Sequence, residues 1–228
     1  MIYNRYNILD ILLVATVVVV SLVLHELAHG YVALWNGDPT AKLKGRLTLN
    51  PLAHFDIFGL FMMMTVGFGY AKPVPVNPFN FRHQKRGIFT VAIAGIVVNL
   101  ILAFLSLGFF GLFGWLSVKF HGAQTAFGYL QLFFIYMEII NLGFAFFNLL
   151  PIHPLDGFRI IESFTRYNNR GVMVMRKCGR YILLALVGVS IIVSAFGLPM
   201  WLDPLGSYIY YARFGADWLF RKFWGLFF

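Results

Sequence analysis

Four long apolar stretches restrict what this chain can fold into more than any other feature. They cover roughly residues 8–35, 88–117, 125–150 and 181–201. Each is at least as long as the roughly 20 residues that a helix needs to cross a bilayer. Hydrophobic residues make up 60% of the chain and charged residues only 12%, whereas about a quarter of a soluble domain is charged. We therefore expect an all-α polytopic membrane protein with about four transmembrane helices.

Two further apolar segments do not fit the pattern of a span. Residues 57–70, IFGLFMMMTVGFGY, are too short to cross and predict a re-entrant or interfacial piece within a β-prone loop over 43–78. In the tail, 205–228, charged residues recur at every fourth position and form one polar stripe. They are Arg213, Asp217 and Arg221. This pattern predicts a C-terminal helix in the membrane interface rather than a fifth span.

Basic residues are concentrated in two of the connections between the spans. Lys and Arg are frequent in the 36–86 and 157–180 loops, whereas 118–124 carries only Lys119. Because positively charged loops stay in the cytoplasm, we expect both loops on that side of the cell (inner) membrane. Loops that face anionic lipids then account for the formal net charge of +9. The chain shows no basic-aromatic module, so we expect no nucleic-acid partner.

The sequence HELAHG at residues 25–30 places three ionisable side chains at the end of the first apolar run. His25 and His29 are four residues apart, so on a helix they share one face and can bind one metal ion. Glu26 can reach a water molecule on that metal. Thiolates cannot build the site, because the chain has one cysteine, Cys178. The motif predicts a zinc-protease centre in the cytoplasmic half of the first span.

A catalytic zinc centre needs a third protein ligand, and several side chains compete for that role. Asp156, in the sequence PLDG, is expected at the same depth as HELAHG. It is also placed to cap a helix that begins with GFRIIESF, and capping is compatible with ligation. His153 is a rival ligand. Glu162 is a further carboxylate, and Glu138 lies too far from the cytoplasmic end of its span to meet His25.

Four motifs follow one another along the chain. They are HELAHG at 25–30, GRLTLNPLAHFDIFG at 45–59, YAKPVPVNP at 70–78 and NLLPIHPLDG at 148–157. Together they resemble, in order and spacing, the motifs of the site-2 proteases, a family of intramembrane zinc metalloproteases. The resemblance implies one metalloprotease domain over 1–228, with a catalytic core at about 8–160 and a C-terminal span and interfacial helix over 178–228. It implies the minimal form of the family, without a PDZ or nucleotide-sensing domain.

Site residues follow from the same resemblance, position by position. By this resemblance, His25, His29 and Asp156 would bind one catalytic Zn²⁺. Glu26 would be the catalytic base. Asn99, in AGIVVNL, and Asn148 match substrate-binding positions, and their alternative role is hydrogen bonding between helices. Isoleucine or histidine replaces a family proline at Ile57, Ile96 and His153. His54 matches a family position too, and we expect it to anchor a loop by a hydrogen bond.

The resemblance implies an endopeptidase that cleaves membrane proteins in or near their transmembrane segments, as in regulated intramembrane proteolysis. Its partners would be a transmembrane protein substrate, the lipid bilayer and a regulatory membrane protein. A membrane helix hides its backbone in hydrogen bonds, so the substrate must unwind locally. We expect a strand in the 43–78 loop to pair with the extended substrate.

Two other functions are compatible with parts of the sequence. A membrane zinc protease of a different kind would use a glutamate, Glu138 or Glu162, as third ligand and would cut unfolded protein. A membrane adaptor or transporter would use the His and Glu cluster for structure or ion passage, and it would tolerate Glu26→Gln. The PLDG segment favours an intramembrane zinc protease over both of these alternatives.

Overall fold

The structure is a computed structural model that describes residues 8–54, 72–165 and 169–227. In these ranges it contains four helices that are long and apolar enough to cross a membrane. They are α1 (Ile8–Trp35), α4 (Gln84–Lys119), α5 (Gln124–Leu149) and α7 (Arg170–Phe196). The expected all-α polytopic membrane protein is confirmed. The division into one domain with a core and a C-terminal part stays a prediction.

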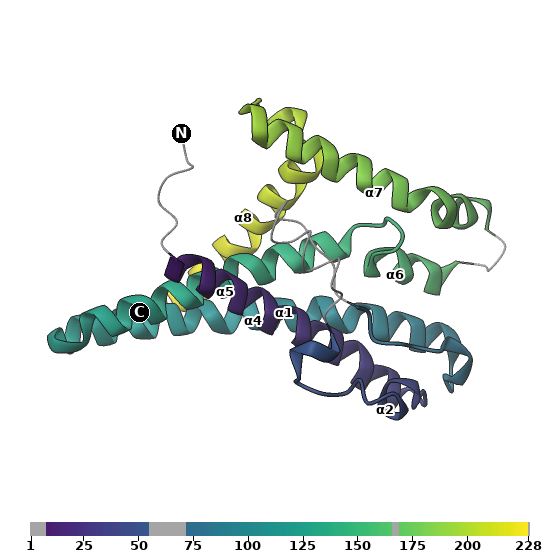
Figure 1. Ribbon diagram of the computed structural model, residues 1–228, viewed down its shortest axis with the longest axis horizontal. Coiled ribbons are helices and arrows are strands. Elements are labelled where there is room, and N and C mark those ends of the chain that lie inside the picture. The colour runs from purple at the N-terminus through teal and green to yellow at the C-terminus, as the bar shows by residue number, and fades with distance from the viewer. Residues whose placement is uncertain (1–7, 55–71, 166–168, 228) are drawn as a thin grey trace.

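The centre of the protein is formed by α1, α4 and α5, which pack against one another (Figure 1). α4 and α5 form an antiparallel hairpin, joined by the 3-10 turn His121–Ala123. The rings of Phe109 and Phe134 stack across this hairpin with centroids 4.9 Å apart, an arrangement that adds to the stability from burial alone. The contacts bring residues far apart in the sequence to the same level of the bundle.

The fourth span begins earlier than the sequence predicts. α7 starts at Arg170, after Asn169, whose side chain accepts a hydrogen bond from the Val172 N–H. Its last residue is Phe196, and the following residue, Gly197, takes the left-handed conformation at φ 61°. The basic connection predicted over 157–180 is therefore mostly helical and not a loop, because residues 156–164 and 170–180 lie in helices. Its last charged residues project from helical turns, because Lys and Arg are good helix formers that lower hydropathy without ending a helix.

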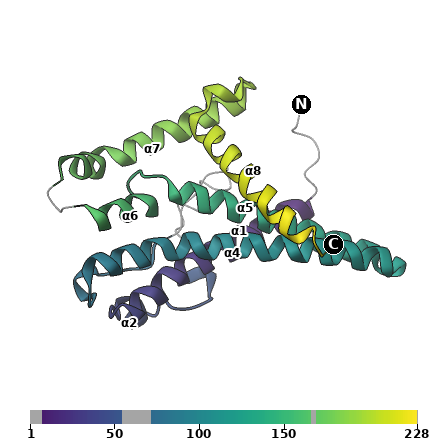
Figure 2. The ribbon, with the colours of Figure 1, turned by 180° about the vertical axis from the view of Figure 1, so that it is seen from behind.

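A short helix, α6 (Asp156–Phe164), follows α5 and packs against α4, as Figure 2 shows from behind. Phe158 anchors it with a side chain that is only 2% exposed. Gly157 allows the turn before it, since a Cβ there would lie 2.1 Å from the carbonyl oxygen of Leu149. The expectation of a helix at GFRIIESF is confirmed, and the turn directs Asp156 toward α1.

The connection between α1 and α4 is organised around Asp38, which is fully buried. Its carboxylate accepts hydrogen bonds from the backbone N–H groups of Thr40 and Asn77 at 3.0 and 2.7 Å, and from the Asn80 side chain at 2.8 Å. Burial alone would raise the pKa of Asp38, but a hydrogen bond from the Thr40 hydroxyl and the bonds named above lower it overall. One carboxylate thus holds together two parts of the connection that are about 40 residues apart.

No strand occurs in the part of this connection that the structure describes, and the piece expected at 57–70 lies outside it. Pro73 and Pro75 have no N–H, and the N–H groups of Lys72 and Val74 already donate to His54 and to Glu26. This stretch therefore has few donors for an incoming strand. The pairing of substrate with the 43–78 loop stays a prediction.

The predicted C-terminal helix is present as α8 (Pro204–Trp224), which runs from the end of α7 across α5 and α4 (Figure 1). The Trp224 ring N–H donates to the carbonyl of Phe104 at 2.8 Å. The polar stripe of α8 faces α5, and it lines a cavity of about 200 Å³ together with Glu138. The stripe thus contacts a buried carboxylate, and its place in the membrane interface stays a prediction.

Candidate metal centre

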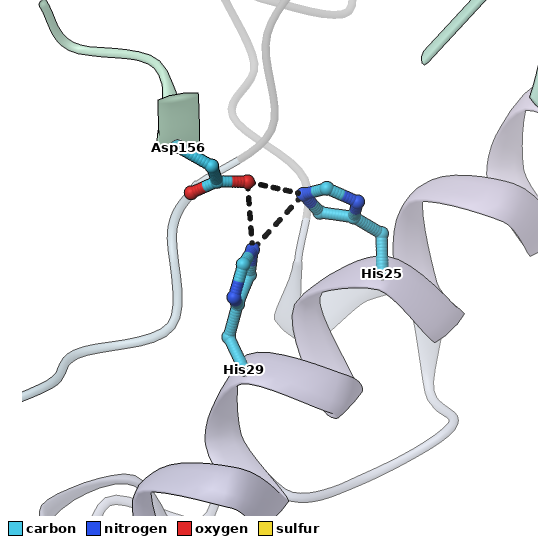
Figure 3. A group of neighbouring side chains, drawn as sticks. All are labelled: His25, His29 and Asp156. Carbon is cyan, nitrogen blue, oxygen red and sulfur yellow. Dashed lines mark hydrogen bonds and ion pairs between the residues drawn. The ribbon is translucent and has the colours of Figure 1, made fainter. Parts of the chain in front are cut away.

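His25 and His29 lie one turn apart on α1, and both side chains point to the same spot (Figure 3). Their Nε2 atoms are 3.0 Å apart, and the residues are only 5% and 8% exposed. The apolar residues of α1 are typical of a membrane span, and the i, i+4 spacing sets the two rings side by side. The expected pairing of the two imidazoles is therefore present.

Asp156 completes the group from the first turn of α6 (Figure 3). Its Oδ2 lies 3.3 Å from Nε2 of His25 and 3.2 Å from Nε2 of His29. This oxygen is buried and has no hydrogen-bond partner among the described residues. The alternative role as a helix cap is not observed, since no side chain caps α6. Burial alone would raise the pKa of the Asp156 carboxyl, but the two histidines lower it overall.

The three donor atoms fit a zinc ion. Zinc binds imidazole nitrogen and carboxylate oxygen at about 2.0–2.2 Å, so two ligands of a tetrahedral site lie about 3.3 Å apart. The three separations here are 3.0, 3.2 and 3.3 Å. Two neutral imidazoles, one carboxylate and one open position are the ligand set of a catalytic zinc centre. The buried oxygen of Asp156 forms no hydrogen bond in the described residues and lies near both imidazoles, and it is the kind of group that such an ion would satisfy.

The second nitrogen of each imidazole is held by α4. Nδ1 of His25 lies 2.6 Å from Oδ1 of Asn99, and Nδ1 of His29 lies 2.7 Å from the carbonyl oxygen of Val91. Metal-binding histidines commonly donate their other ring N–H in this way, which fixes the ring and leaves Nε2 for the metal. Both imidazoles are thus oriented by α4 with Nε2 left for a metal.

α4 approaches these rings closely because residue 95 is glycine. A Cβ on Gly95 would lie 2.4 Å from Cε1 of His25 and 2.6 Å from Nε2 of His29. No side chain can occupy that space without moving the imidazoles. Val91, Gly95 and Asn99 follow one another at intervals of four residues, so a single face of α4 serves the site. Sequence reasoning missed Gly95, whose only signal was its place one turn before Asn99.

Glu26 lies beside the two histidines on α1 and is half-buried. Its Oε2 accepts a hydrogen bond from the backbone N–H of Val74 at 2.8 Å. A carboxylate fixed by one oxygen is held in place while its other oxygen stays outside that bond. The residue expected to act as base is therefore anchored to the 72–77 stretch.

The rival ligands lie elsewhere. His153 packs its ring against Phe158 at 5.5 Å, and burial lowers its pKa. Glu162 pairs with Arg176 at 2.6 Å. Glu138 is 2% exposed and faces α8. In the described ranges, only one group of three or more ligating side chains comes together, and it does not include these residues.

Three other residues singled out in the sequence are also located. Asn99 has both ends of its amide bonded within the protein, to His25 and to Asn141, so hydrogen bonding between helices is observed. Asn148 donates to the carbonyl of Phe144 on its own helix, at 3.1 Å. A substrate role for either asparagine stays a prediction. The loop-anchoring role of His54 is confirmed, because its Nε2 bonds the carbonyl of Thr48 at 2.8 Å.

Comparison with known proteins agrees with this site. The sequence model of peptidase family M50 matches residues 111–190. A Bacillus subtilis (strain 168) protein named "Putative zinc metalloprotease YwhC" is 40% identical over 204 residues, which cover 87% of this chain and 84% of that protein. A Mycobacterium tuberculosis (strain H37Rv) protein named "Putative zinc metalloprotease Rip2" is 29% identical over 217 residues, covering 92% and 79%. No solved structure matches the chain.

A buried centre of two histidines and a carboxylate, with a glutamate beside it and apolar helices around it, defines a membrane zinc protease. The chain belongs to peptidase family M50, the site-2 protease family. It is an integral membrane protein, and its cofactor is Zn²⁺.

Proposed function

We propose that this protein is an intramembrane zinc endopeptidase, which hydrolyses peptide bonds in or near the transmembrane segments of other membrane proteins. The observation that carries the proposal is the burial of the ligand group between helices that are themselves apolar enough to span a membrane. Ionisable groups cost free energy in such surroundings. A protease that cuts soluble chains does not need its metal centre there.

His25, His29 and Asp156 would hold the ion. Zinc bound there supplies a Lewis acid for the scissile carbonyl and a water whose pKa is lowered to about 7. Asn99 and the carbonyl of Val91 orient the two imidazoles. Glu26 takes a proton from the attacking water and passes it to the leaving amine nitrogen. The Val74 N–H keeps that carboxylate in place during both transfers.

A cavity of about 320 Å³ is lined by Val91, whose carbonyl binds His29, and by His153 and Arg159, while the three ligands lie outside its lining. We propose this cavity as the place where a substrate chain enters. Its lining combines apolar and charged side chains, which suits a segment that leaves the bilayer for water. The excess of Lys and Arg in the flanking connections supports a centre in the cytoplasmic half of the cell membrane.

The test is cleavage of single-pass membrane proteins tagged at both ends, co-expressed with wild type or with Glu26→Gln. We expect cuts that mass spectrometry maps in or beside the transmembrane segment, and their loss in the variant. Cleavage of unfolded casein but of no membrane protein would favour the soluble-substrate protease. Identical processing in wild type and variant would overturn the enzyme assignment and favour the adaptor.

A further inference from the structure

We infer that Asn141 is a positioning residue for zinc, because it selects the tautomer of His25 through the side chain of Asn99. The inference rests on the proposed metal centre. Asn141 lies on α5 and touches none of the three ligands in any described contact, and nothing in the sequence pattern marked it. Its side chain is completely buried, as are those of Ser21 and Asn99.

The tautomer of His25 decides whether the site can bind a metal. A neutral imidazole carries its proton on one nitrogen and a lone pair on the other. Nε2 faces Asp156 and His29, so a metal-binding His25 must carry the proton on Nδ1. Nδ1 faces Asn99 at 2.6 Å. The amide of Asn99 permits this tautomer only when its oxygen, and not its NH₂ group, points at the ring.

The orientation of the Asn99 amide is in turn set by Asn141. The Nδ2 atom of Asn99 donates to Oδ1 of Asn141 at 2.9 Å. Were the Asn141 amide reversed, its NH₂ group would face that of Asn99, and Asn99 would have to reverse as well. Its NH₂ group would then face Nδ1 of His25 and place the proton on Nε2, where the metal binds.

A backbone carbonyl prevents this reversal. Nδ2 of Asn141 donates to the carbonyl oxygen of Met137 at 2.8 Å and to Oγ of Ser21 at 2.8 Å. A carbonyl can only accept, so the NH₂ group of Asn141 must point at it. The directions of both amides and the proton on Nδ1 of His25 follow from this one acceptor. These side chains have no exposed surface, so bulk water does not compete for their hydrogen bonds.

The two zinc-binding histidines therefore depend on different parts of the protein. Nδ1 of His29 meets the Val91 carbonyl directly, an acceptor that needs no orienting. His25 instead depends on a chain of two amides contributed by α4 and α5. Polar side chains in membranes often serve only to bind helices together. If that were the role of these asparagines, their removal would weaken the bundle without changing which ring nitrogen of His25 carries the proton.

The experiment is a double-mutant cycle on the full-length, detergent-purified protein, with zinc affinity measured by competition with a chelator. We expect Asn141→Leu to lower zinc affinity about 10- to 100-fold, the range for lost partners of metal ligands. In an Asn99→Asp background we expect the same substitution to cost no affinity. A carboxylate offers an acceptor to Nδ1 of His25 in either orientation, so it needs no orienting neighbour.

A structural role would give another pattern. Equal losses of zinc affinity from Asn141→Leu in both backgrounds, or no loss in either, would overturn the inference. Gln131→Leu is the matched control, because Gln131 also sits on α5 and donates to an α4 carbonyl, that of Phe110, without contact to His25. Its zinc affinity should equal that of wild type.

Two further measurements separate positioning from folding. Thermal unfolding of the zinc-free variants reports any loss of the bundle itself, and Asn141→Ala replaces Asn141→Leu in the cycle if the larger side chain prevents folding. The visible absorption of Co²⁺-loaded protein reports the ligand geometry, and we expect it to change in Asn141→Leu and to return in the Asn99→Asp double variant. None of these readouts requires proteolysis, so they stand apart from the test of the proposed function.

Discussion

The Oε2 atom of Glu26 accepts a hydrogen bond from the backbone N–H of Val74, 48 residues further along the chain. The bond joins the helix that bears the two histidines to a connection in which Val74 stands between two prolines. It fixes the carboxylate of Glu26, the residue after His25, by a contact that no local pattern requires. Because Pro73 and Pro75 restrict the backbone on both sides, the Val74 N–H is held in a fixed direction.

Glu26→Gln should abolish proteolysis while leaving the zinc centre intact. The glutamine oxygen can still accept from Val74, but the side chain can no longer take a proton, so we expect cleavage to fall at least about 100-fold. Zinc content, measured by mass spectrometry of the purified protein, should stay equal to that of wild type. Loss of zinc together with activity would mean that Glu26 binds the metal.

Zinc content should identify the ligands one at a time. His25→Ala, His29→Ala and Asp156→Ala each leave two donors and one buried group without its partner, so purified protein should contain far less zinc than wild type. Glu138→Ala and His153→Ala are controls, because both residues lie outside the ligand group. Normal zinc in Asp156→Ala, with loss in either control, would contradict the site described above.

Gly95→Ala should damage the centre although the change is one methyl group. The added carbon would lie 2.4 Å from His25 and 2.6 Å from His29, so α4 must move away or the rings must turn. We expect weaker zinc binding and lower thermal stability. Gly143→Ala on α5 is the matched control, since nothing lies within 4 Å of its new carbon and its zinc affinity should not change.

Asp38 should make part of the stability dependent on acid. Its pKa is lowered in the folded protein, so its contribution is complete above the ordinary carboxyl pKa of 3.8 and is lost as the pH falls below it. Asp38→Asn should cost about 1–3 kcal/mol at neutral pH, because an NH₂ group would face backbone donors. Melting temperatures of both proteins between about pH 7 and about pH 3 should converge toward the acid end. Parallel curves would refute this role for Asp38.

The spans and the two histidines could be predicted because their signals are local. An apolar run of 20 residues can form few structures other than a membrane helix. Two residues at i and i+4 share a face on any helix. Asp156 was predicted by resemblance, and the turn at Gly157 supplies the physical reason for its direction. The early start of α7 was missed because hydropathy detects only the apolar part of a helix that can lie in the bilayer. The polar turns that precede this part are helical too, and hydropathy does not detect them.

Gly95 and Asn141 could not be predicted, because their roles depend on how α1, α4 and α5 are set against one another. A glycine in an apolar helix looks the same whether it faces lipid or an imidazole. Asn141 is separated from Ser21 by 120 residues. Only the packing of the bundle brings Nδ2 of Asn141 to 2.8 Å from Oγ of Ser21. The link between Glu138 and α8 is missed for the same reason, since Arg213 and Asp217 also fit a water-facing stripe.

The face of α4 formed by Val91, Gly95 and Asn99 has a consequence for how this chain can change. Each residue inserted into or deleted from a helix turns everything beyond it by about 100°. A single such change between positions 91 and 99 would separate the acceptor for one imidazole from the acceptor for the other. This two-turn segment must therefore keep its length for the enzyme to keep its metal.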